Sequence, residues 1–333
     1  MGSIPTPATK SIQNKKMRFI FDFIIIFILL FSGYWMYVII RSFFYSKILG
    51  PKTKFWRSVI LAFLAIVFTT IGWGSFVSPK IIKVTETKLN FNYTASHEAI
   101  KVVLLSDIHF GPYKKTYFAK KIVKKVKQLN PDLILLGGDY ILGKADNIKY
   151  LEPIQELSKT IPTFAVSGNH EYNLPYDNSP KLVDKTGPMR KYFKKWGITI
   201  LENKTEEVII NNNKINITGL PDIWTHRDNL HVAKYNLDPR TPNILLTHNP
   251  DIILKDNHSE FDLILSGHTH AGQVRLPLFG AIPPLPTTLG KAFDQGLFKL
   301  KNGQLYISAG LGESGPRARL FNHPEIATFT IDL

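Results

Sequence analysis

Five apolar runs in the last two-thirds of the chain each end in a short cluster of polar residues. The runs read VVLLSD, DLILLGGD, PTFAVSGN, NILLTH and DLILSGH. A continuous aliphatic and β-branched run is typical of a strand that is buried on both faces of its sheet. In open α/β sheets, the loops that leave the carboxyl ends of such strands converge on the ligand-binding edge. The pattern therefore predicts five strands that carry their polar clusters to one cleft.

The segments between these runs predict helices and flanking strands. Phe118, Ile122 and Val126 recur at helical spacing among lysines, which indicates an amphipathic helix with a solvated basic face. A second helix is expected over residues 181–196, which interleave apolar and basic positions. The stretches VTETKLNF and ATFTIDL alternate apolar and polar residues, so they predict an opening and a closing strand. Together these patterns favour an α/β protein.

Two further apolar runs, residues 19–40 and 59–77, lie near the amino terminus. Each approaches the roughly 20 residues that an α-helix needs to cross a bilayer. We expect residues 1–80 to form a disordered tail and a two-helix membrane anchor, and residues 81–333 to form one catalytic domain. Buried core helices are an alternative. A cleaved signal peptide is disfavoured, because the first run is long, lacks a clear small-residue cleavage site and is followed at once by the second.

The net charge of +15 is concentrated in the anchor. Ten basic residues and one acidic residue lie at or before Lys80, so nine of the fifteen charges belong there, where anionic headgroups would attract them. The remainder favours an anionic substrate. The side of the membrane that the catalytic domain occupies stays open, because the connector, the tail and the stretch after the second run are all basic. The chain has no cysteine, so disulfides give no clue.

The polar clusters supply carboxylate, amide and imidazole groups. Imidazole and carboxylate donors without thiolate suit Mn, Fe, Zn or Co. Asp107 and His109 are two residues apart, so on an extended segment they would share a face, and His268 and His270 repeat the spacing. One carboxylate that bridges two ions holds them about 3.5–4 Å apart, the spacing of two-metal hydrolases. The eight candidate site residues are Asp107, His109, Asp139, Asn169, His170, His248, His268 and His270.

The blocks LSDIHFG, LGGDY, SGNHE, LTHNP and SGHTH, in this order, resemble those of the calcineurin-like metallophosphoesterase superfamily. The resemblance covers roughly residues 98–333 and implies a four-layer sandwich of two mixed β-sheets flanked by helices. It also implies two divalent metal ions and attack on phosphorus by a metal-bridging hydroxide. Asp139 would bridge the ions, and His170 would be the catalytic histidine. The other implied ligands are Asp107, His109 and His270 for one ion, and Asn169, His248 and His268 for the other.

Three stretches are similar to the membrane-associated YaeI/YkuE-like branch of that superfamily. They read AGQVRLPLFGAIPP, SAGLGESGPRARLFNHPEIATFTI and ILENKTEEVIINNNKINITGLPD. The Pro-rich stretch LPLFGAIPPLPTTLG has no regular period and predicts a rigid loop beside the last polar block. By this resemblance we expect a phosphohydrolase anchored in a bacterial inner membrane and preferring manganese. Its substrate would be a lipid-linked phosphodiester or pyrophosphate, with UDP-2,3-diacylglucosamine of the lipid A pathway as the most concrete candidate.

Other interpretations remain beside this one. Tyr172 and His226 are further candidates, for substrate binding. A broad-specificity phosphodiesterase outside the cytoplasm is an alternative, as is a catalytically silent membrane scaffold, although a scaffold is expected to have lost ligands. Nucleic acid is not an expected partner, because no helix-turn-helix, RNA-binding aromatic signature or zinc-finger spacing is present.

Overall fold

The computed structural model describes residues 7–45, 49–91, 93, 99–174, 183–235, 237–238, 240–255 and 258–333. The chain divides into two compact units. Met1–Ile81 and Gly315–Leu320 form the first, here called the helical unit. Ile82–Ser314 and Phe321–Leu333 form the second, here called the sandwich unit.

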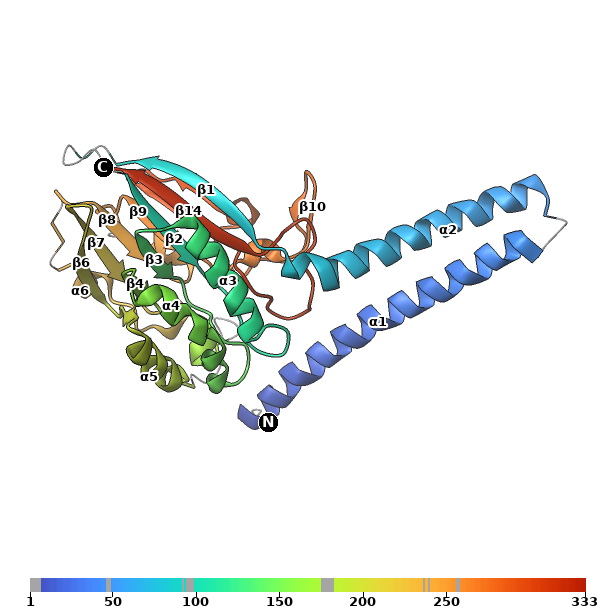
Figure 1. Cartoon of the computed structure of the whole chain (residues 1–333), viewed down its shortest axis with the longest axis horizontal. Helices are drawn as coiled ribbons and strands as arrows, with labels where there is room; N and C mark the ends of the chain where they lie inside the picture. The colour runs from blue at the N-terminus through green and yellow to red at the C-terminus, as the bar shows by residue number, and fades with distance from the viewer. Residues whose placement is uncertain are drawn as a thin grey trace. The chain divides into compact units, whose positions relative to one another are not determined.

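The helical unit is built on two long antiparallel helices, α1 (Pro7–Tyr45) and α2 (Pro51–Gly72) (Figure 1). Both are long and apolar enough to cross a membrane, and in their most apolar windows only 6% and 11% of the residues are buried. α1 contains the predicted span 19–40, and the predicted span 59–77 begins in α2 and ends at Val77 of the π-helical turn that follows. α1 begins at Pro7, within the segment predicted as a tail.

Small residues lie where the two helices meet. A side chain at Gly33 would contact the ring of Phe68 at 3.6 Å. Beyond α2 the chain continues in a π-helical turn, Trp73–Val77, and a 3-10 turn, Ser78–Lys80. The segment Gly315–Leu320 is held against these turns, because the Arg319 amide donates to the Gly74 carbonyl at 2.8 Å. The second membrane-length helix thus ends in a turn that binds a distant piece of the chain.

The sandwich unit contains two six-stranded mixed sheets. The strands of the first sheet, in spatial order, are β1 (Lys83–Asn90), β14 (Glu325–Asp332), β2 (Ile100–Leu105), β3 (Leu133–Leu136), β4 (Thr163–Ala165) and β5 (Thr199–Ile200). Those of the second sheet are β12 (Gly296–Lys299), β13 (Gln304–Ile307), β9 (Leu263–Ser266), β8 (Asn243–Leu246), β7 (Asn213–Gly219) and β6 (Lys204–Ile210). In the first sheet the parallel block β2 to β5 is joined through the antiparallel pair β2–β14 to the parallel pair β14–β1. In the second sheet the parallel block from β13 to β7 has an antiparallel neighbour on each side, β12 and β6. The predicted opening and closing strands are β1 and β14.

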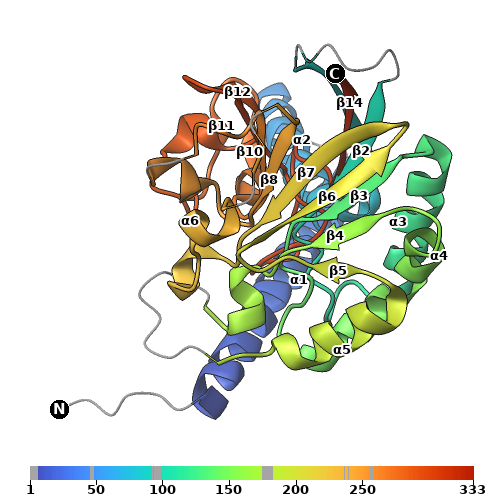
Figure 2. The same ribbon diagram turned by 90° about the vertical axis from the view of Figure 1, so that its left-hand side faces the viewer.

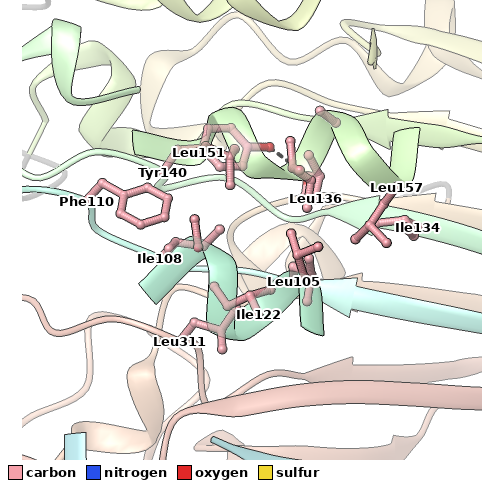
Figure 3. Close-up of a cluster of buried hydrophobic side chains, with 14 of the residues drawn as sticks. Leu105, Ile108, Phe110, Ile122, Ile134, Leu136, Tyr140, Leu151, Leu157 and Leu311 are labelled. Atoms are coloured by element: carbon pink, nitrogen blue, oxygen red, sulfur yellow. Dashed lines mark hydrogen bonds between the residues drawn. The ribbon is translucent and has the colours of Figure 1, made fainter. Parts of the chain in front are cut away.

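Alternate side chains of the parallel strands face two different cores. Val102 and Leu104 of β2 meet Ile244 and Leu246 of β8 in the core between the sheets. Leu105 points to the other face of β2, where it joins the helices (Figure 3). This burial on both faces explains why the strands read as continuous apolar runs rather than as an alternation.

Helices cover both outer faces of the sandwich (Figure 2). The first sheet is covered by η3 (Ala145–Ile154), α4 (Gln155–Ser158) and two longer helices, α3 (Thr116–Leu129) and α5 (Thr186–Trp196). Phe118, Ile122 and Val126 are the buried stripe of α3, as predicted. The second predicted helix is shorter than expected, since α5 begins at Thr186; the start of the expected range lies outside the described residues.

The second sheet is covered by short elements. Its outer core contains residues of η5 (Ile223–Thr225), α6 (Leu230–Ala233) and η6 (Pro250–Leu254). The remaining elements are η4 (Asn169–Tyr172), η7 (His270–Gly272), η8 (Lys291–Phe293) and a small hairpin of β10 (Arg275–Leu276) and β11 (Gly280–Ala281). The four-layer sandwich of two mixed sheets flanked by helices is therefore confirmed. The Pro-rich stretch that was predicted to be a rigid loop begins with this β-hairpin.

Candidate metal centre

All eight candidate residues follow the carboxyl ends of five parallel strands, each within five residues of the strand's end. β2, β3 and β4 belong to the first sheet and β8 and β9 to the second, so both sheets contribute. Seven of the side chains gather into three overlapping groups in which every pair of potential ligand atoms lies within 4.8 Å. The groups are Asp107, His109 and His270; His109, Asp139 and His170; and Asp139, His248 and His268.

The backbone delivers these side chains in a different way from the one that we expected. Asp107 (φ 53°) and His109 (φ 51°) do not extend β2 but adopt left-handed conformations, as do His268 (φ 71°) and His270 (φ 51°). The expectation of two extended pairs was therefore wrong. Asp139 (φ 54°) shares the conformation. Left-handed backbone is uncommon outside glycine, and its concentration here is typical of strained functional loops.

Backbone hydrogen bonds hold the loops after β2 and β3 in register. The Asp107 amide donates to the Gly138 carbonyl, and the His109 amide donates to the Asp139 carbonyl, both at 3.0 Å. The Phe110 amide donates to the Tyr140 carbonyl at 2.7 Å. Ladder bonds between the strands are thus replaced by bonds between the ligand-bearing loops, which fixes Asp107 and His109 relative to Asp139.

The first cluster joins the two sheets. The Nε2 atoms of His109 and His270 are 3.0 Å apart. His270 Nε2 also lies 3.4 Å from Asp107 Oδ1. Two imidazole nitrogens and a carboxylate oxygen thus point at one small volume from β2 and β9.

Asn169, His248 and His268 form a second cluster of similar construction. His268 Nδ1 lies 3.1 Å from Asn169 Oδ1 and 3.2 Å from His248 Nε2. Asn169 also donates from its amide nitrogen to the Leu174 carbonyl, which turns its Oδ1 toward His268. This cluster therefore presents two ring nitrogens and an amide oxygen.

Asp139 lies between the two clusters. Its Oδ2 atom is 3.4 Å from His109 Nε2 and 3.2 Å from His248 Nε2. The side chain is almost completely buried, and its Oδ1 accepts from the His170 amide at 2.9 Å. One carboxylate oxygen thus faces a ligand of each cluster, which is the position that a bridging ligand needs.

Neighbouring groups fix the orientation of the ligand atoms. Ser106 Oγ donates to Asp107 Oδ2 at 2.6 Å, and the His268 amide approaches both oxygens of that carboxylate at 3.1 Å. His248 Nδ1 lies 2.8 Å from the Gly137 carbonyl, which can only accept, so this nitrogen carries a proton and Nε2 is the atom that faces Asp139. Such supporting bonds are characteristic of metal ligands.

Two glycines allow the carboxylates to be enclosed. A Cβ at Gly168 would lie 2.2 Å from Asp139 Oδ1, and a Cβ at Gly267 would lie 2.1 Å from Asp107 Oδ2. Neither distance is compatible with a side chain, so these positions require glycine for close approach.

Burial keeps two of the imidazoles neutral. Desolvation, with the positive charge of His170, holds the pKa of His109 well below its usual value. Desolvation and the charge of His248 lower the pKa of His268 to about 3. Both rings are thus in the form that binds a cation.

The carboxylates create a demand for positive charge. Burial by itself would raise the pKa of Asp139, but His248 and His170 outweigh it and hold the pKa well below the usual range. Burial also opposes charge on His248, yet Asp139 and Asp107 raise its pKa well above normal. Asp107 itself has its pKa raised to about 6, chiefly by desolvation. Without a cation, the positive charge that these carboxylates favour is therefore a proton on His248.

These features fit divalent metal. Ring nitrogens and carboxylate oxygens converge at distances of 3.0–3.4 Å in a buried space, where their lone pairs would repel one another without a cation between them. The donors are nitrogen and oxygen only, as Mn, Fe, Zn and Co prefer. The clusters are therefore candidate metal-binding groups.

His170 differs from the other imidazoles in its exposure. Its side chain is 19% exposed, and its Nε2 lies 3.9 Å from Asp139 Oδ2. The ring centroids of His170 and His109 are 4.6 Å apart. His170 is thus beside the clusters and accessible from outside, as a group that meets substrate must be.

The two residues predicted to bind substrate lie in different surroundings. Tyr172 is buried, and its hydroxyl lies 3.2 Å from Ser167 Oγ, so its side chain is enclosed rather than presented to substrate. His226 is exposed, with φ 55°, in the turn after η5. Two residues earlier, the ring of Trp224 stands edge-on to the ring of His268 at 4.5 Å. The loop that carries His226 therefore reaches the centre through Trp224.

The sequence interpretation missed Glu171 as an organising residue. Its fully buried carboxyl group accepts from four backbone amides, those of Gly168 (2.8 Å), Asp139 (2.9 Å), Tyr140 (3.0 Å) and Ile141 (3.3 Å). Desolvation and the charge of Asp139 raise its pKa to about 8. Its place in SGNHE, next to two predicted site residues, was the available signal. Glu171 ties the loop after β3 to the loop after β4.

Comparison with known proteins agrees with this geometry. Residues 100–272 match the family model described as calcineurin-like phosphoesterase. A metallophosphoesterase of Campylobacter jejuni is 32% identical over 70% of this chain and 59% of its own length. YkuE of Bacillus subtilis, a metallophosphoesterase, is 27% identical over 78% of this chain and 89% of its own. The phosphodiesterase YaeI of Escherichia coli is 27% identical over 77% of this chain and 92% of its own.

Replacing Glu171 with Gln should destabilise the fold. The amide would place a donor against backbone N–H groups that are themselves donors, and each buried unsatisfied group costs about 1–3 kcal/mol. We expect a lower unfolding temperature of the full chain in detergent, followed by circular dichroism. Glu156→Gln is the matched control, because Glu156 is exposed and pairs with Lys127 at the surface. Equal unfolding temperatures for the two variants would contradict the organising role of Glu171.

Proposed function

The chain belongs to the calcineurin-like phosphoesterase family, and on that premise we propose that it is a membrane-anchored phosphohydrolase with two divalent metal ions. The family makes it a metal-dependent phosphoesterase. The observation that carries the two-ion proposal is the position of Asp139, whose Oδ2 lies within 3.4 Å of a ring nitrogen in each cluster. A carboxylate placed in this way can serve both ions.

The assignment of ligands follows the two clusters. Asp107, His109 and His270 would hold one ion, and Asn169, His248 and His268 the other. Manganese suits this donor set best in our proposal, and iron, zinc and cobalt are compatible with it. When bound, the ions would offset the charge of the phosphate and lower the pKa of a water molecule.

His170 is proposed to act on the reacting phosphate. Its side chain is the most accessible imidazole of the clusters, and its backbone amide is fixed by Asp139 Oδ1 at 2.9 Å. An imidazole in this place can donate a proton to the leaving alkoxide or a hydrogen bond to a phosphate oxygen. Glu171 and Ser106 act only through the residues that they orient.

A lipid-linked substrate is the proposal for the substrate class. The two membrane-length helices expose apolar side chains along their length, including Phe27 (56%) and Ile66 (64%), so they are unlike core helices of a soluble protein. Anchoring in a bacterial inner membrane would raise the local concentration of a lipid phosphodiester or pyrophosphate such as UDP-2,3-diacylglucosamine. The name of YaeI, a phosphodiesterase, supports the diester chemistry. His226, exposed near Trp224, remains a proposed substrate contact, whereas the burial of Tyr172 favours a supporting role.

A broad-specificity phosphodiesterase outside the cytoplasm is the second candidate function. It is favoured by the positive charge of the whole chain, which attracts anionic substrates of any kind. A silent scaffold is disfavoured, because all eight candidate side chains are retained and brought together. The side of the membrane that the sandwich unit occupies separates the two enzymatic proposals, since nucleotide-linked lipids are on the cytoplasmic face.

Changing Asp139 to Asn should remove both metal and activity. The amide lacks the charge shared by the two clusters, so we expect lower metal content by elemental analysis. Hydrolysis of a chromogenic phosphodiester should fall at least about 10²-fold, as when an oriented electrostatic group is lost. Asp146→Asn, an exposed change in the same connection between β3 and β4, is the control. Retention of most activity and metal by the Asp139 variant would refute the bridging role.

Changing His170 to Ala should separate catalysis from metal binding. We expect metal content near that of the unmodified protein and a turnover lower by about 10²–10⁴, the usual effect of losing a proton-transfer group. The change in turnover is measured on the chromogenic diester at saturating substrate. Loss of metal from this variant would instead make His170 a ligand or a structural support.

Two arginine substitutions should release the chain from membranes. The full chain is expected to stay in the membrane fraction after washing with alkaline carbonate. A double variant with Phe27→Arg and Ile66→Arg should be extracted, because each charge at a span centre costs about 2.5–3.5 kcal/mol of insertion. Phe44→Arg is the control, since a long side chain at a helix end can reach the headgroups. Extraction of the unmodified chain would refute the anchor.

A further inference from the structure

The sandwich unit carries an exposed apolar surface beside the metal centre. It consists of Leu276, Leu278 and Phe279 in the β10–β11 hairpin, Ile282 just after it, and Phe321; we call it the apolar hairpin surface. Leu278 is fully exposed, Phe279 is 77% exposed and Phe321 is 63% exposed. The hairpin and Phe321 line one hollow of about 450 Å³. Residues 276–290 include no charged side chain, in a chain that is 20% charged.

The backbone turns these side chains outward at a conformational cost. Leu278 has φ 70° and Phe321 has φ 51°, a conformation that is an outlier for bulky residues. The register of the hairpin pairs Leu276 with Gly280, so Pro277, Leu278 and Phe279 form its tip. Large apolar groups held in water by strained backbone are evidence of a surface that binds something.

Chain connection brings this surface close to the end of the second membrane-length helix. The Arg319 amide is hydrogen-bonded to Gly74, two residues beyond the end of α2. In the same segment the Arg317 guanidinium lies 4.4 Å from the ring centroid of Phe76. Phe321 follows Arg319 by two residues, and two residues span at most about 7 Å. Phe321 is therefore tethered to the terminus of the proposed span, whatever the orientation of the units.

The apolar hairpin surface is also connected to the metal centre. Asn322, next to Phe321, donates from its side chain to the His270 carbonyl at 2.7 Å. At the base of the hairpin, Arg275 pairs with Asp294, whose carbonyl accepts from Thr269 Oγ1 at 2.6 Å. Residues next to both parts of the surface are thus linked by hydrogen bonds to the loop that carries His268 and His270.

We propose that the apolar hairpin surface inserts into the interfacial region of the lipid bilayer. It forms a second membrane contact, besides α1 and α2, and holds the loop of His268 and His270 at the level of the headgroup phosphates. The inference rests on the proposed anchor, and it deepens the proposed function by naming how a lipid phosphate reaches the centre. Leucine and phenylalanine on an uncharged loop are suited to the boundary between headgroups and acyl chains.

Site-directed fluorescence tests this insertion in the full chain. The natural sequence has no cysteine, so Phe279→Cys gives a single site for an environment-sensitive NBD label. The protein is reconstituted into vesicles of phosphatidylethanolamine and phosphatidylglycerol, with and without doxyl-labelled phosphatidylcholine. We expect a blue shift of the emission on reconstitution and a loss of fluorescence with the doxyl lipid. Flotation of the vesicles reports separately whether the chain is anchored.

Ile209→Cys provides the matched control. Ile209 is 64% exposed, and it lies on β6 opposite Lys214 of β7, at the end of the strand remote from Gly219 and the ligand-bearing loops. Its label should show neither change. Floated protein whose label at position 279 behaves like that at 209 would overturn the insertion while leaving the anchor intact. A blue shift without quenching by the doxyl lipid would also overturn it, because a second copy of the chain would then cover the surface. Failure to float would overturn both proposals.

Discussion

The carboxylate of Asp139, buried among imidazoles from both sheets, is the group on which the rest of this centre depends. A buried carboxylate is stable only when positive charge compensates it. Asp139 obtains that compensation from His248 and His170, one from each sheet. The same demand makes the space a site for cations, and it links the two sheets at the point where their strands end.

Gathering these polar side chains requires strained backbone conformations, which interactions outside the centre stabilise. Asp107, His109 and Asp139 lie in left-handed backbone conformations that a free loop would not maintain. Their loops are held by backbone bonds between the segments after β2 and β3, and by the four amides that donate to Glu171. The apolar cores on both faces of each sheet provide the rigid strands from which these loops leave. The apolar cores thus provide the stability that offsets the strained backbone at the centre.

The proposed membrane contacts give this phosphoesterase a defined working surface. Two apolar helices would confine the chain to a bilayer, and the apolar hairpin surface would determine which side of the sandwich unit faces the lipid. Residues beside that surface are linked to the loop of His268 and His270 by two hydrogen bonds. Access to the centre and attachment to the membrane would then be properties of the same part of the chain, which is why we propose lipid phosphates as the substrate class.

Sequence alone determined the strands and the identity of the donor groups. Buried strands leave long apolar runs, and VVLLSD or DLILSGH shows both the run and the residues that follow it. It also identified the stripe of α3 and the two membrane-length helices, since these depend on local periodicity and length. It was wrong about the extended pairs at Asp107 and His268, and it gave no role to Glu171. Those features depend on contacts between loops that are distant in the chain, as do the shared position of Asp139 and the burial of Tyr172. Only the tertiary structure decided them, because left-handed backbone and a shared carboxylate are stable only when groups from several strands satisfy them together.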